Sequence, residues 1–403
     1  MEQWKQYKLS DICDLIAGFA FKSVDFGTEG AFVVKIKDIQ PPFVNLDDAD
    51  KVNLTAYDTA KLKKFLISKG DFLLAMTGAT IGKIGKYISN EQSYLNQRVL
   101  KFLPKQQVDS KFIYYSLLTN AFRLYILNHI DSDSAQPNIS ANTIGKYELS
   151  IPCIETQKRI ADILSSLDDK IELNRRINDN LEQQAQALFK AWFVDFEPFK
   201  DGKFVESELG MIPEGWKVLK FNSFITPLNE KVQTGILPEY SVTNNGIIPR
   251  SEKFSKQLSS STSNNKVLKF NNIVFGMSRE ILNWGIMQDK IGSVSSAYHV
   301  YNINEDIISP LYLKYLMETM SSYFNDLIGA TSREGQSLDK NALMKKLVYI
   351  PSPEIWDSFV NINTSLRNKQ NENLNEISLL LNLRDTLLPK LMSGELKIND
   401  LNC

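Results

Sequence analysis

Residues 155–196 read ETQKRIADILSSLDDKIELNRRINDNLEQQAQALFKAWFVDF and contain neither glycine nor proline. Apolar residues recur in this segment at alternating spacings of three and four, which is typical of a helix that packs along one narrow stripe. Charged side chains such as Lys158, Asp169 and Arg176 occupy the flanking positions. The pattern predicts a coiled-coil helix of roughly 40 residues, on the order of 60 Å long at ~1.5 Å per residue.

A second segment, 199 positions later, has the same pattern. The predicted seam positions of the first segment are Ile160, Leu164, Leu167, Ile171, Asn174, Asn178, Leu181, Ala185, Leu188 and Trp192. Those of the second are Phe359, Asn363, Leu366, Gln370, Asn373, Ile377, Leu380, Arg384, Leu387 and Leu391. Pro389 is expected to kink or end the second helix near Leu388. Each helix alone would expose its stripe to water, so we expect the two to pair, and we favour antiparallel pairing.

Two asparagines, Asn174 and Asn373, occupy matching seam positions. An amide in an apolar seam costs stability, but it fixes the register of the helices when it has a partner. The alternative is that Asn-rich helices expose some amides and that the seam is imperfect.

The rest of the chain also contains an internal sequence repeat. WKQYKL (Trp4–Leu9) matches WKVLKF (Trp216–Phe221), 212 positions later. Three further pairs of segments, DFLLAMT and NIVFGMS, KFIYYSLL and LYLKYLM, and ELSIP and LVYIP, match at offsets of 201, 200 and 199. Offsets that fall smoothly indicate one module that was duplicated and then shortened in its loops.

Each module reads as a mixed α/β domain. Short β-branched and aromatic runs broken by Gly, Asn and Pro predict strands, and residues 112–126 predict a helix whose counterpart lies at 312–323. The expected fold is therefore α+β, with two mixed α/β domains separated by two long helices that form an antiparallel coiled coil. The expected boundaries are 1–152 and 216–351 for the domains, 153–196 and 352–392 for the helices, 197–215 for a linker and 393–403 for a tail.

Composition excludes several classes of protein. The net charge is −1, but residues 4–150 carry +3 and residues 216–350 carry +4, so any nucleic-acid binding must come from local patches. Three distant cysteines and two histidines provide neither a disulfide framework nor a zinc site, and no metal site is expected. With no apolar run of about 18 residues and no signal-peptide order at the start, we expect no membrane contact and a cytoplasmic location.

Three short motifs resemble catalytic ones but depart from them. TGATIGKIG (Thr77–Gly85) has the wrong glycine spacing for a phosphate-binding loop and lacks the hydroxyl after Lys83, so it predicts a glycine-rich turn after a strand. QPPF (Gln40–Phe43) has Gln where amino-methyltransferases have Asp or Asn, and it reads as a loop. Asp109 and Lys111 form an isolated DxK without a partner acid. We therefore expect no catalytic residues, and we expect the two histidines to be packed against aromatic rings.

Polar tracts at similar places in both modules indicate recognition. Asn, Gln and Arg side chains read adenine and guanine edges in the major groove, and lysines hold phosphates. The candidate DNA-binding residues are Lys22, Ser23, Lys35, Lys37, Thr77, Lys83, Lys86, Asn96, Gln97, Arg98, Gln136, Asn138, Arg250, Lys253, Arg279, Ser296, Tyr298, Arg333 and Gln336. Each such loop alone is more often plain surface, but its repetition in two modules favours a binding role.

The layout resembles the specificity subunit of type I restriction–modification systems. The resemblance covers nearly the whole chain and rests on GFAFKS (Gly18–Ser23), AQPNIS (Ala135–Ser140), LGMIPEGWKV (Leu209–Val218) and LRDTLLPKLMSGEL (Leu383–Leu396). The second module departs from it where REGQSLD stands in place of the AQPNIS type.

The resemblance implies a non-catalytic subunit whose two domains each read one half of a split, asymmetric sequence in double-stranded DNA. The helices would set the gap between the halves and dock two methyltransferase subunits, through which the nuclease–translocase subunits join. The cofactors S-adenosylmethionine, ATP and Mg²⁺ would belong to those partners. Two alternatives stay open: a stand-alone DNA methyltransferase or nuclease, and a coiled-coil scaffold whose globular domains bind proteins or other ligands.

Overall fold

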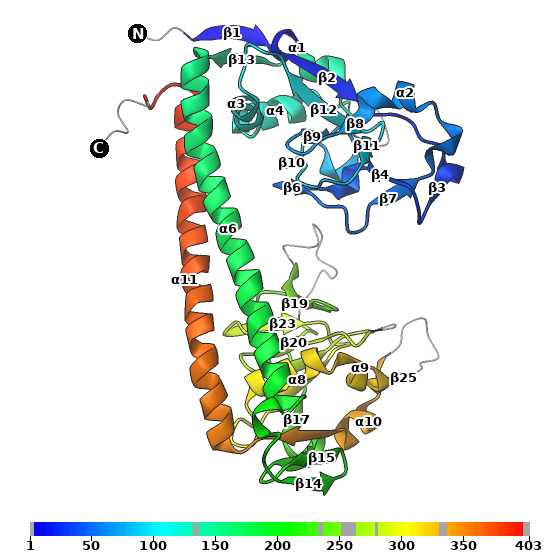
Figure 1. Cartoon of the computed structure of the whole chain (residues 1–403), viewed down its shortest axis with the longest axis vertical. Coiled ribbons are helices and arrows are strands. Elements are labelled where there is room, and N and C mark those ends of the chain that lie inside the picture. The colour runs from blue at the N-terminus through cyan, green and yellow to red at the C-terminus, as the bar shows by residue number, and fades with distance from the viewer. Residues whose placement is uncertain are drawn as a thin grey trace. The chain divides into compact units, whose positions relative to one another are not determined.

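A computed structural model describes residues 4–131, 137–232, 237–250, 263–278, 281–329 and 337–397. Its contacts divide the chain into two compact units, Met1–Arg176 with Asn373–Cys403, and Ile177–Glu372. Two helices of 40 residues each, α6 (Ile154–Phe193) and α11 (Pro353–Met392), run through both units (Figure 1). Each unit therefore contains one module and part of both helices. None of the helices in the described ranges is long and apolar enough to cross a membrane.

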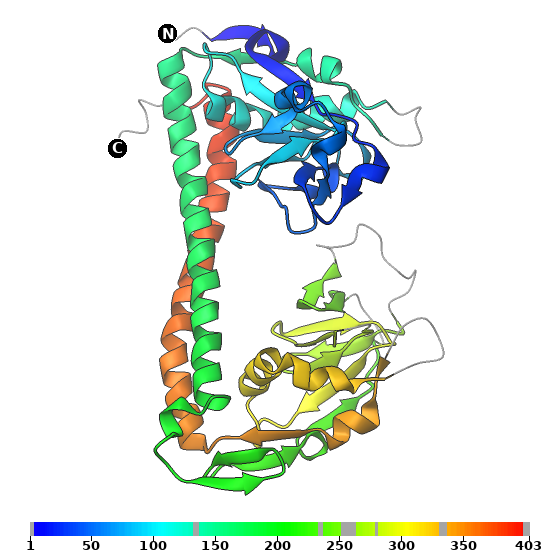
Figure 2. The same ribbon diagram turned by 45° about the vertical axis from the view of Figure 1, so that its right-hand side comes forward.

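The helices α6 and α11 pair in antiparallel fashion, as expected. In the first unit, Arg384 Nη1 lies 3.0 Å from Asp168 Oδ1. In the second unit, the side-chain amides of Asn178 and Gln370 each donate to the other residue's backbone carbonyl oxygen over 3.2 Å. Residue numbers rise along one helix as they fall along the other, which confirms the predicted direction (Figure 2).

All the predicted seam residues are buried or half-buried. The side chains of Asn174 and Asn373 are only 1% and 2% exposed, and Asn174 Nδ2 donates to Glu376 Oε2 over 2.7 Å. The expectation of partnered amides is confirmed for Asn174, and the alternative of solvent-facing amides is wrong. Of the two effects predicted for Pro389, an end of the helix near Leu388 is wrong, and a kink stays a prediction. Pro389 lies in the last turn of α11, where the helix ends at Met392 only three residues later.

The first module, which we call module 1, contains two larger sheets and one two-stranded sheet within its described residues. Its elements are β1 (Lys5–Lys8), α1 (Leu9–Ile12), β2 (Cys13–Ala17), β3 (Phe26–Gly27), β4 (Ala31–Val34), β5 (Ile39–Gln40), β6 (Phe43–Val44), β7 (Asp50–Val52), α2 (Thr59–Leu62), β8 (Leu66–Ile67), β9 (Phe72–Ala75), β10 (Ile84–Lys86), β11 (Ser93–Leu95), β12 (Val99–Pro104), α3 (Ser110–Leu117), α4 (Asn120–Asn128), α5 (Ala141–Gly145) and β13 (Glu148–Ile151). One sheet has the order β2-β12-β9-β10-β6-β5 and the other β3-β7-β4-β11-β8, while β1 pairs with β13.

The second module, module 2, has smaller sheets. Its elements are β14 (Phe204–Ser207), β15 (Gly210–Pro213), β16 (Lys217–Lys220), β17 (Ile225–Leu228), β18 (Tyr240–Thr243), β19 (Gly246–Pro249), β20 (Lys266–Lys269), β21 (Ile273–Phe275), β22 (Trp284–Ile286), β23 (Ile291–Val294), β24 (His299–Ile303), α8 (Pro310–Thr319), α9 (Ser321–Phe324), β25 (Ile328–Gly329), β26 (Ser337–Leu338), α10 (Lys340–Lys345) and β27 (Leu347–Ile350). The main sheet has the order β17-β24-β21-β22, and β16 pairs with β27. The expected linker contains the hairpin of β14 and β15.

The duplication is visible in the strand order. The series β17-β24-β21-β22 in module 2 corresponds to β2-β12-β9-β10 in module 1, and the terminal pair β16–β27 corresponds to β1–β13. The register agrees as well, because Ser93 pairs with Ile67 in module 1 and Gly292 pairs with Leu268 in module 2. The predicted internal repeat is therefore present residue by residue in the sheet framework.

The single helix expected at residues 112–126 is wrong, because the chain forms two helices there. The helix α3 ends at Leu117, and Thr119 begins α4 by accepting a hydrogen bond from the backbone N–H of Phe122. A side-chain cap stabilises a new helix start, and apolar periodicity alone does not reveal it. The counterpart in module 2 divides in the same way, into α8 and α9.

The ends of the long helices belong to the cores of the modules. In module 1, Ile160 and Leu164 of α6 and Leu391 of α11 pack with Phe112 of α3. In module 2, Phe189 and Phe193 of α6 pack with Tyr312 and Tyr315 of α8 and with Phe359 of α11. Burying these large side chains ties each module to its part of the helix pair.

Candidate nucleic-acid interface

Four of the polar segments predicted to bind DNA in module 1 lie side by side and are joined through their backbones. The backbone of Phe19 forms a bridge with that of Asn96, and Gln97 N donates to Phe19 O over 3.0 Å. The backbone of Thr77 forms a bridge with that of Asn138, and Met76 N donates to Arg98 O over 3.0 Å. The segments around Gly18, Thr77, Asn96 and Asn138 are therefore joined by main-chain hydrogen bonds, and none of them is an independent loop.

The segment between β11 and β12 forms a tight turn, which we call the Asn96–Val99 turn. Val99 N donates to Asn96 O over 2.9 Å, and Arg98 N lies 3.4 Å from the accepting Asn96 Oδ1. Gly18 lies directly against this turn, and a Cβ added at Gly18 would be 2.2 Å from Asn96 O and 2.4 Å from Leu95 O. Only glycine permits this approach, so the glycine of GFAFKS serves the packing of the turn.

The candidate side chains of this region differ in exposure. Gln97, Arg98 and Lys83 are exposed, and none of their side chains forms an ion pair or hydrogen bond within the described ranges. Asn138 and Lys86 are half-buried, and Asn96 is half-buried with its carbonyl oxygen in the turn. Thr77, by contrast, is buried, and its hydroxyl donates to Pro137 O over 2.9 Å. The prediction that Thr77 contacts DNA is wrong, because its side chain is used inside the module.

Lys22 and Ser23 lie on a separate loop of module 1. Both are exposed, and the loop is clamped by Tyr57, whose hydroxyl accepts from Lys22 N over 3.0 Å and donates to Asp25 Oδ2 over 2.5 Å. Beneath it, Tyr57 makes edge contacts with Phe19 and Phe21. This clamp is not apparent from the sequence, because its two sides are 32 residues apart.

Two predicted phosphate contacts share one carboxylate, which compensates part of their positive charge. Lys35 Nζ lies 3.0 Å from Asp50 Oδ2 and Lys37 Nζ lies 3.4 Å from the same oxygen. The hydrogen bond from Lys35 lowers the pKa of Asp50 from its ordinary value, so the carboxylate stays charged. These two lysines contribute less to a positive surface than exposed lysines without a carboxylate neighbour.

Module 2 contains the corresponding turn, between β23 and β24. Tyr298 N donates to Ser295 O over 3.0 Å, and Ala297 N donates to Ser295 Oγ over 3.3 Å. Ser296 is exposed and Tyr298 is half-buried. This Ser295–Tyr298 turn is the counterpart of the Asn96–Val99 turn.

Positive charge lies near the module 2 turn on two neighbouring elements, β20 and α10. Lys266 Nζ donates to Tyr298 O over 2.6 Å. Burial, with Lys340 and Lys266 nearby, lowers the pKa of His299 to about 4, and burial with Lys340 lowers that of Lys266. The proximity of Lys266 to Lys340 is not apparent from the sequence, because these residues lie on a strand and a helix start that are 74 positions apart.

Several candidates are not brought together with these turns, or lie outside the described ranges. Arg250 Nε lies 3.7 Å from Glu239 Oε2, so its charge is compensated. Gln136, Lys253, Arg279, Arg333 and Gln336 lie outside the described residues.

The motifs that resembled catalytic ones have structural roles. The TGATIGKIG segment contains the turn between the antiparallel strands β9 and β10, as predicted. Asp109 Oδ1 accepts from Phe112 N and caps α3, while Lys111 Nζ donates to Ser165 Oγ. QPPF is the turn and part of both strands of the β5–β6 hairpin, so the loop prediction is wrong in part. Within the described ranges, no group of three His, Cys, Asp or Glu residues is placed to hold a metal ion.

The two histidines differ in their surroundings. His299 is half-buried beside the module 2 turn. His129 is exposed, although its ring stacks on Tyr125 with 4.1 Å between centroids. The expectation of packing against an aromatic ring is confirmed for His129, but it is a surface contact.

The side chains in the helix seam cannot all contact a partner protein, because they pack inside the helix pair. The residues predicted for the helix seam, and with the helices for partner docking, include Ile160, Leu164, Leu167, Ile171, Asn174, Leu181, Leu188, Phe359, Leu366, Asn373, Ile377, Leu380 and Leu387, and all of these are buried or half-buried. Leu173 of α6 and Leu374, Leu379 and Leu383 of α11 are exposed instead, with Leu379 at 70%. A partner would reach these outer leucines without opening the helix pair.

Taken together, two copies of one α/β module, each with a hydrogen-bonded polar turn near positive charge, describe a two-module recognition protein. Residues 1–183 match the family model of the type I restriction modification DNA specificity domain.

Similar proteins extend the match beyond this domain. The type I restriction enzyme MjaIX specificity subunit of Methanocaldococcus jannaschii is 28% identical over 369 residues, which cover 87% of this chain and 83% of that protein. The type I restriction enzyme HindI specificity subunit of Haemophilus influenzae is 32% identical over 210 residues, which cover 50% of this chain and 43% of that protein. The crystal structure of the type I S subunit from M. genitalium aligns over 97% of this chain and 96% of the M. genitalium chain, with a TM-score of 0.48 and 16% identity. The chain resembles type I specificity subunits over most of its length.

Proposed function

We propose that this chain is the non-catalytic specificity subunit of a type I restriction–modification complex. The observation that carries the proposal is the duplication of one α/β module, with the same strand order and the same hydrogen-bonded turn in each copy. Two copies that differ in their exposed side chains are suited to read two different half-sites in double-stranded DNA. Covalent linkage raises the effective concentration of the second module once the first has bound.

Contact with the phosphate backbone would come from exposed cations, supported in module 2 by the half-buried Lys266. In module 1, Lys22, Lys83 and Arg98 are exposed and form no ion pair within the described residues. In module 2, Lys266 and Lys340 concentrate positive charge beside the Ser295–Tyr298 turn. Neutralising phosphates releases counterions, so this binding weakens as salt rises.

The helix pair would set the gap between half-sites and bind the methyltransferase subunits, two per chain. Its outer leucines, including Leu379 and Leu383, supply an exposed apolar face for this contact. The restriction endonuclease–translocase subunits would join through the methyltransferase subunits. S-adenosylmethionine, ATP and Mg²⁺ would bind to these partners, and the cytoplasmic location expected from the sequence is part of the same proposal.

The test is an exchange of module 1 in a host that also expresses the cognate methyltransferase subunit. Residues 1–150 are replaced by those of another specificity subunit, and methylated adenines are mapped across the host genome. We expect one half of the recognised sequence to change and the other half to stay the same. The matched control exchanges residues 216–351 and should change the opposite half.

Two outcomes would contradict the proposal. If either exchange changed both halves, the modules would not read independently. If the complex with the methyltransferase subunit bound no duplex in a salt-dependent manner, the scaffold alternative would be favoured.

A further inference from the structure

The two modules present one turn in the same backbone geometry but with different side chains. In module 1, Asn96 accepts the N–H of Val99 at its backbone oxygen and the N–H of Arg98 at its side-chain oxygen. In module 2, Ser295 accepts the N–H of Tyr298 and the N–H of Ala297 in the same two ways. An Asn amide and a Ser hydroxyl perform the same capping here, as both commonly do in turns.

The strands around the turns fix a residue-by-residue correspondence. The strand before each turn pairs in equivalent register, Ser93 with Ile67 and Gly292 with Leu268. The strand after each turn pairs with the corresponding central strand, β12 with β9 and β24 with β21. Gln97 therefore corresponds to Ser296, and Arg98 corresponds to Ala297.

The variable side chains point away from the module in both copies. Gln97, Arg98, Ser296 and Ala297 are all exposed. The backbone beneath Gln97 and Arg98 is held at consecutive residues, by Phe19 O, by Asn96 Oδ1 and by the N–H of Met76. A rigid turn holds exposed side chains in place, which lowers the ordering cost of binding.

We propose that these turns are specificity-determining elements, and that Gln97 and Arg98 read base edges in the half-site of module 1. This inference rests on the proposed function. Arg forms a bidentate pair with guanine and Gln with adenine, and neither side chain is engaged within the described part of module 1. Ser296 and Ala297 occupy the corresponding positions in module 2. Their hydroxyl and methyl groups offer different contacts from the amide of Gln97 and the guanidinium of Arg98. The same backbone turn thus presents different side chains to DNA in the two modules.

The experiment compares variants of the full chain in complex with the methyltransferase subunit. Q97A, R98K and the double variant Q97S/R98A, which transfers the side chains of module 2 into module 1, are tested by mapping methylated adenines and by duplex binding. K69A is the matched control, because Lys69 is an exposed cation on another turn of module 1. We expect discrimination at one or two base pairs of one half-site to fall by about ten- to a hundredfold in each variant. The other half-site and the K69A pattern should stay unchanged.

The outcomes separate this inference from the proposed function. If the unaltered complex methylates no split sequence, the proposed function fails. If it does, and the R98K and Q97A variants keep the full half-site while binding all duplexes more weakly, the residues contact phosphates and the inference is overturned. A change in both half-sites would overturn it as well. Thermal unfolding of each purified complex distinguishes altered reading from a misfolded module, since the turn variants are on the surface and should unfold like the control.

Discussion

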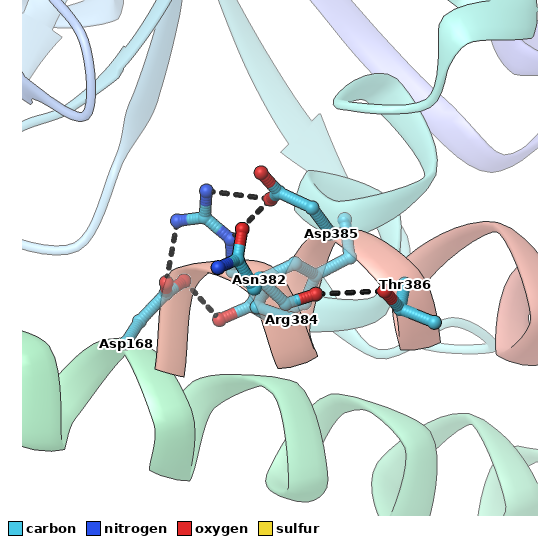
Figure 3. Close-up of polar contacts among 6 residues, drawn as sticks. Asp168, Asn382, Arg384, Asp385 and Thr386 are labelled. Carbon is cyan, nitrogen blue, oxygen red and sulfur yellow. Dashed lines mark hydrogen bonds and ion pairs between the residues drawn. The ribbon is translucent and has the colours of Figure 1, made fainter. Parts of the chain in front are cut away.

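Asp168 of α6 and Arg384 of α11 are joined by an ion pair in which Arg384 Nη1 lies 3.0 Å from Asp168 Oδ1 (Figure 3). The other carboxylate oxygen of Asp168 accepts the hydroxyl of Tyr115 over 2.7 Å. Burial, with Asp168 nearby, raises the pKa of Tyr115, so the phenol remains a donor. One carboxylate thus connects module 1 to both long helices.

We expect Tyr115→Phe to lower the free energy of unfolding by about 1.5–3 kcal/mol, since it leaves a partly buried carboxylate with one donor fewer. Asp168→Asn should cost a similar amount, and the double variant should cost less than the sum of the two. The measurement is thermal unfolding of the three variants. Glu172→Gln is the control, because the Glu172–Arg176 pair lies on the surface with Arg176 at 70% exposure, and it should cost under about 0.5 kcal/mol. Additive effects of Tyr115→Phe and Asp168→Asn would show that the network does not act as a unit.

The contact of Gly18 with the Asn96–Val99 turn leads to a prediction about module 1. A Cβ at Gly18 would be 2.2 Å from Asn96 O, a backbone atom that cannot move alone. We expect Gly18→Ala to destabilise module 1 by about 1–3 kcal/mol and to weaken recognition of its half-site. Gly27→Ala is the matched control, because nothing lies within 4 Å of the added Cβ. Equal melting temperatures for the two variants would contradict the packing role of Gly18.

The environment of His299 predicts a pH dependence of stability. Burial, Lys340 and Lys266 lower its pKa to about 4 in the folded chain, whereas an unfolded histidine has a pKa of about 6.5. Below about pH 6.5 the unfolded state binds a proton that the folded state does not, so the stability contributed by His299 is lost as pH falls toward 4. His299→Asn should therefore lose less stability than the unaltered chain between pH 7 and pH 5.

The measurement is the melting temperature of both proteins at several pH values. Asp38, whose pKa is raised to about 6 mainly by burial, contributes the opposite slope in module 1. Because both proteins contain Asp38, the difference between them isolates His299. Identical pH profiles would show that His299 titrates normally in the folded chain.

The sequence predicted the framework well but the surface incompletely. The seam was predictable because helical periodicity forces a narrow apolar stripe to be buried, and the repeat was predictable because matching segments keep their order. The burial of Thr77 was not predictable, since its partner Pro137 is 60 residues away. The ion pair of Lys35 with Asp50 likewise depends on strand pairing between β4 and β7, which spacing along the chain does not reveal.

Asn174 provides a test of the polar part of the seam. Its side chain is 1% exposed and donates to Glu376 Oε2 over 2.7 Å, while Lys170 Nζ lies 3.5 Å from the same oxygen. We expect Asn174→Ala to lower the free energy of unfolding by about 1–3 kcal/mol, through the lost hydrogen bond and the space left behind. Asn368→Ala, at an exposed position of α11, is the control and should change stability by less than about 0.5 kcal/mol. A stabilised Asn174→Ala would show that this amide is retained for register at a cost in stability.

The antiparallel seam also allows the proposed spacing role to be tested without breaking the helix pair. Inserting four residues into α6 alone, near Asn180, would shift every later seam position relative to α11. Inserting seven residues into α6 near Asn180 and seven into α11 near Gln370 instead keeps the heptad pattern in both helices. Seven residues add about 10 Å of helix, which corresponds to about three base pairs of duplex. We expect mapping of methylated adenines to show both half-sites unchanged and the gap between them lengthened. The control inserts seven Gly and Ser residues between Lys200 and Lys203, outside the helices, and should leave the gap as it was. If the paired insertion left the gap unchanged while the complex still methylated DNA, the helices would not set the spacing.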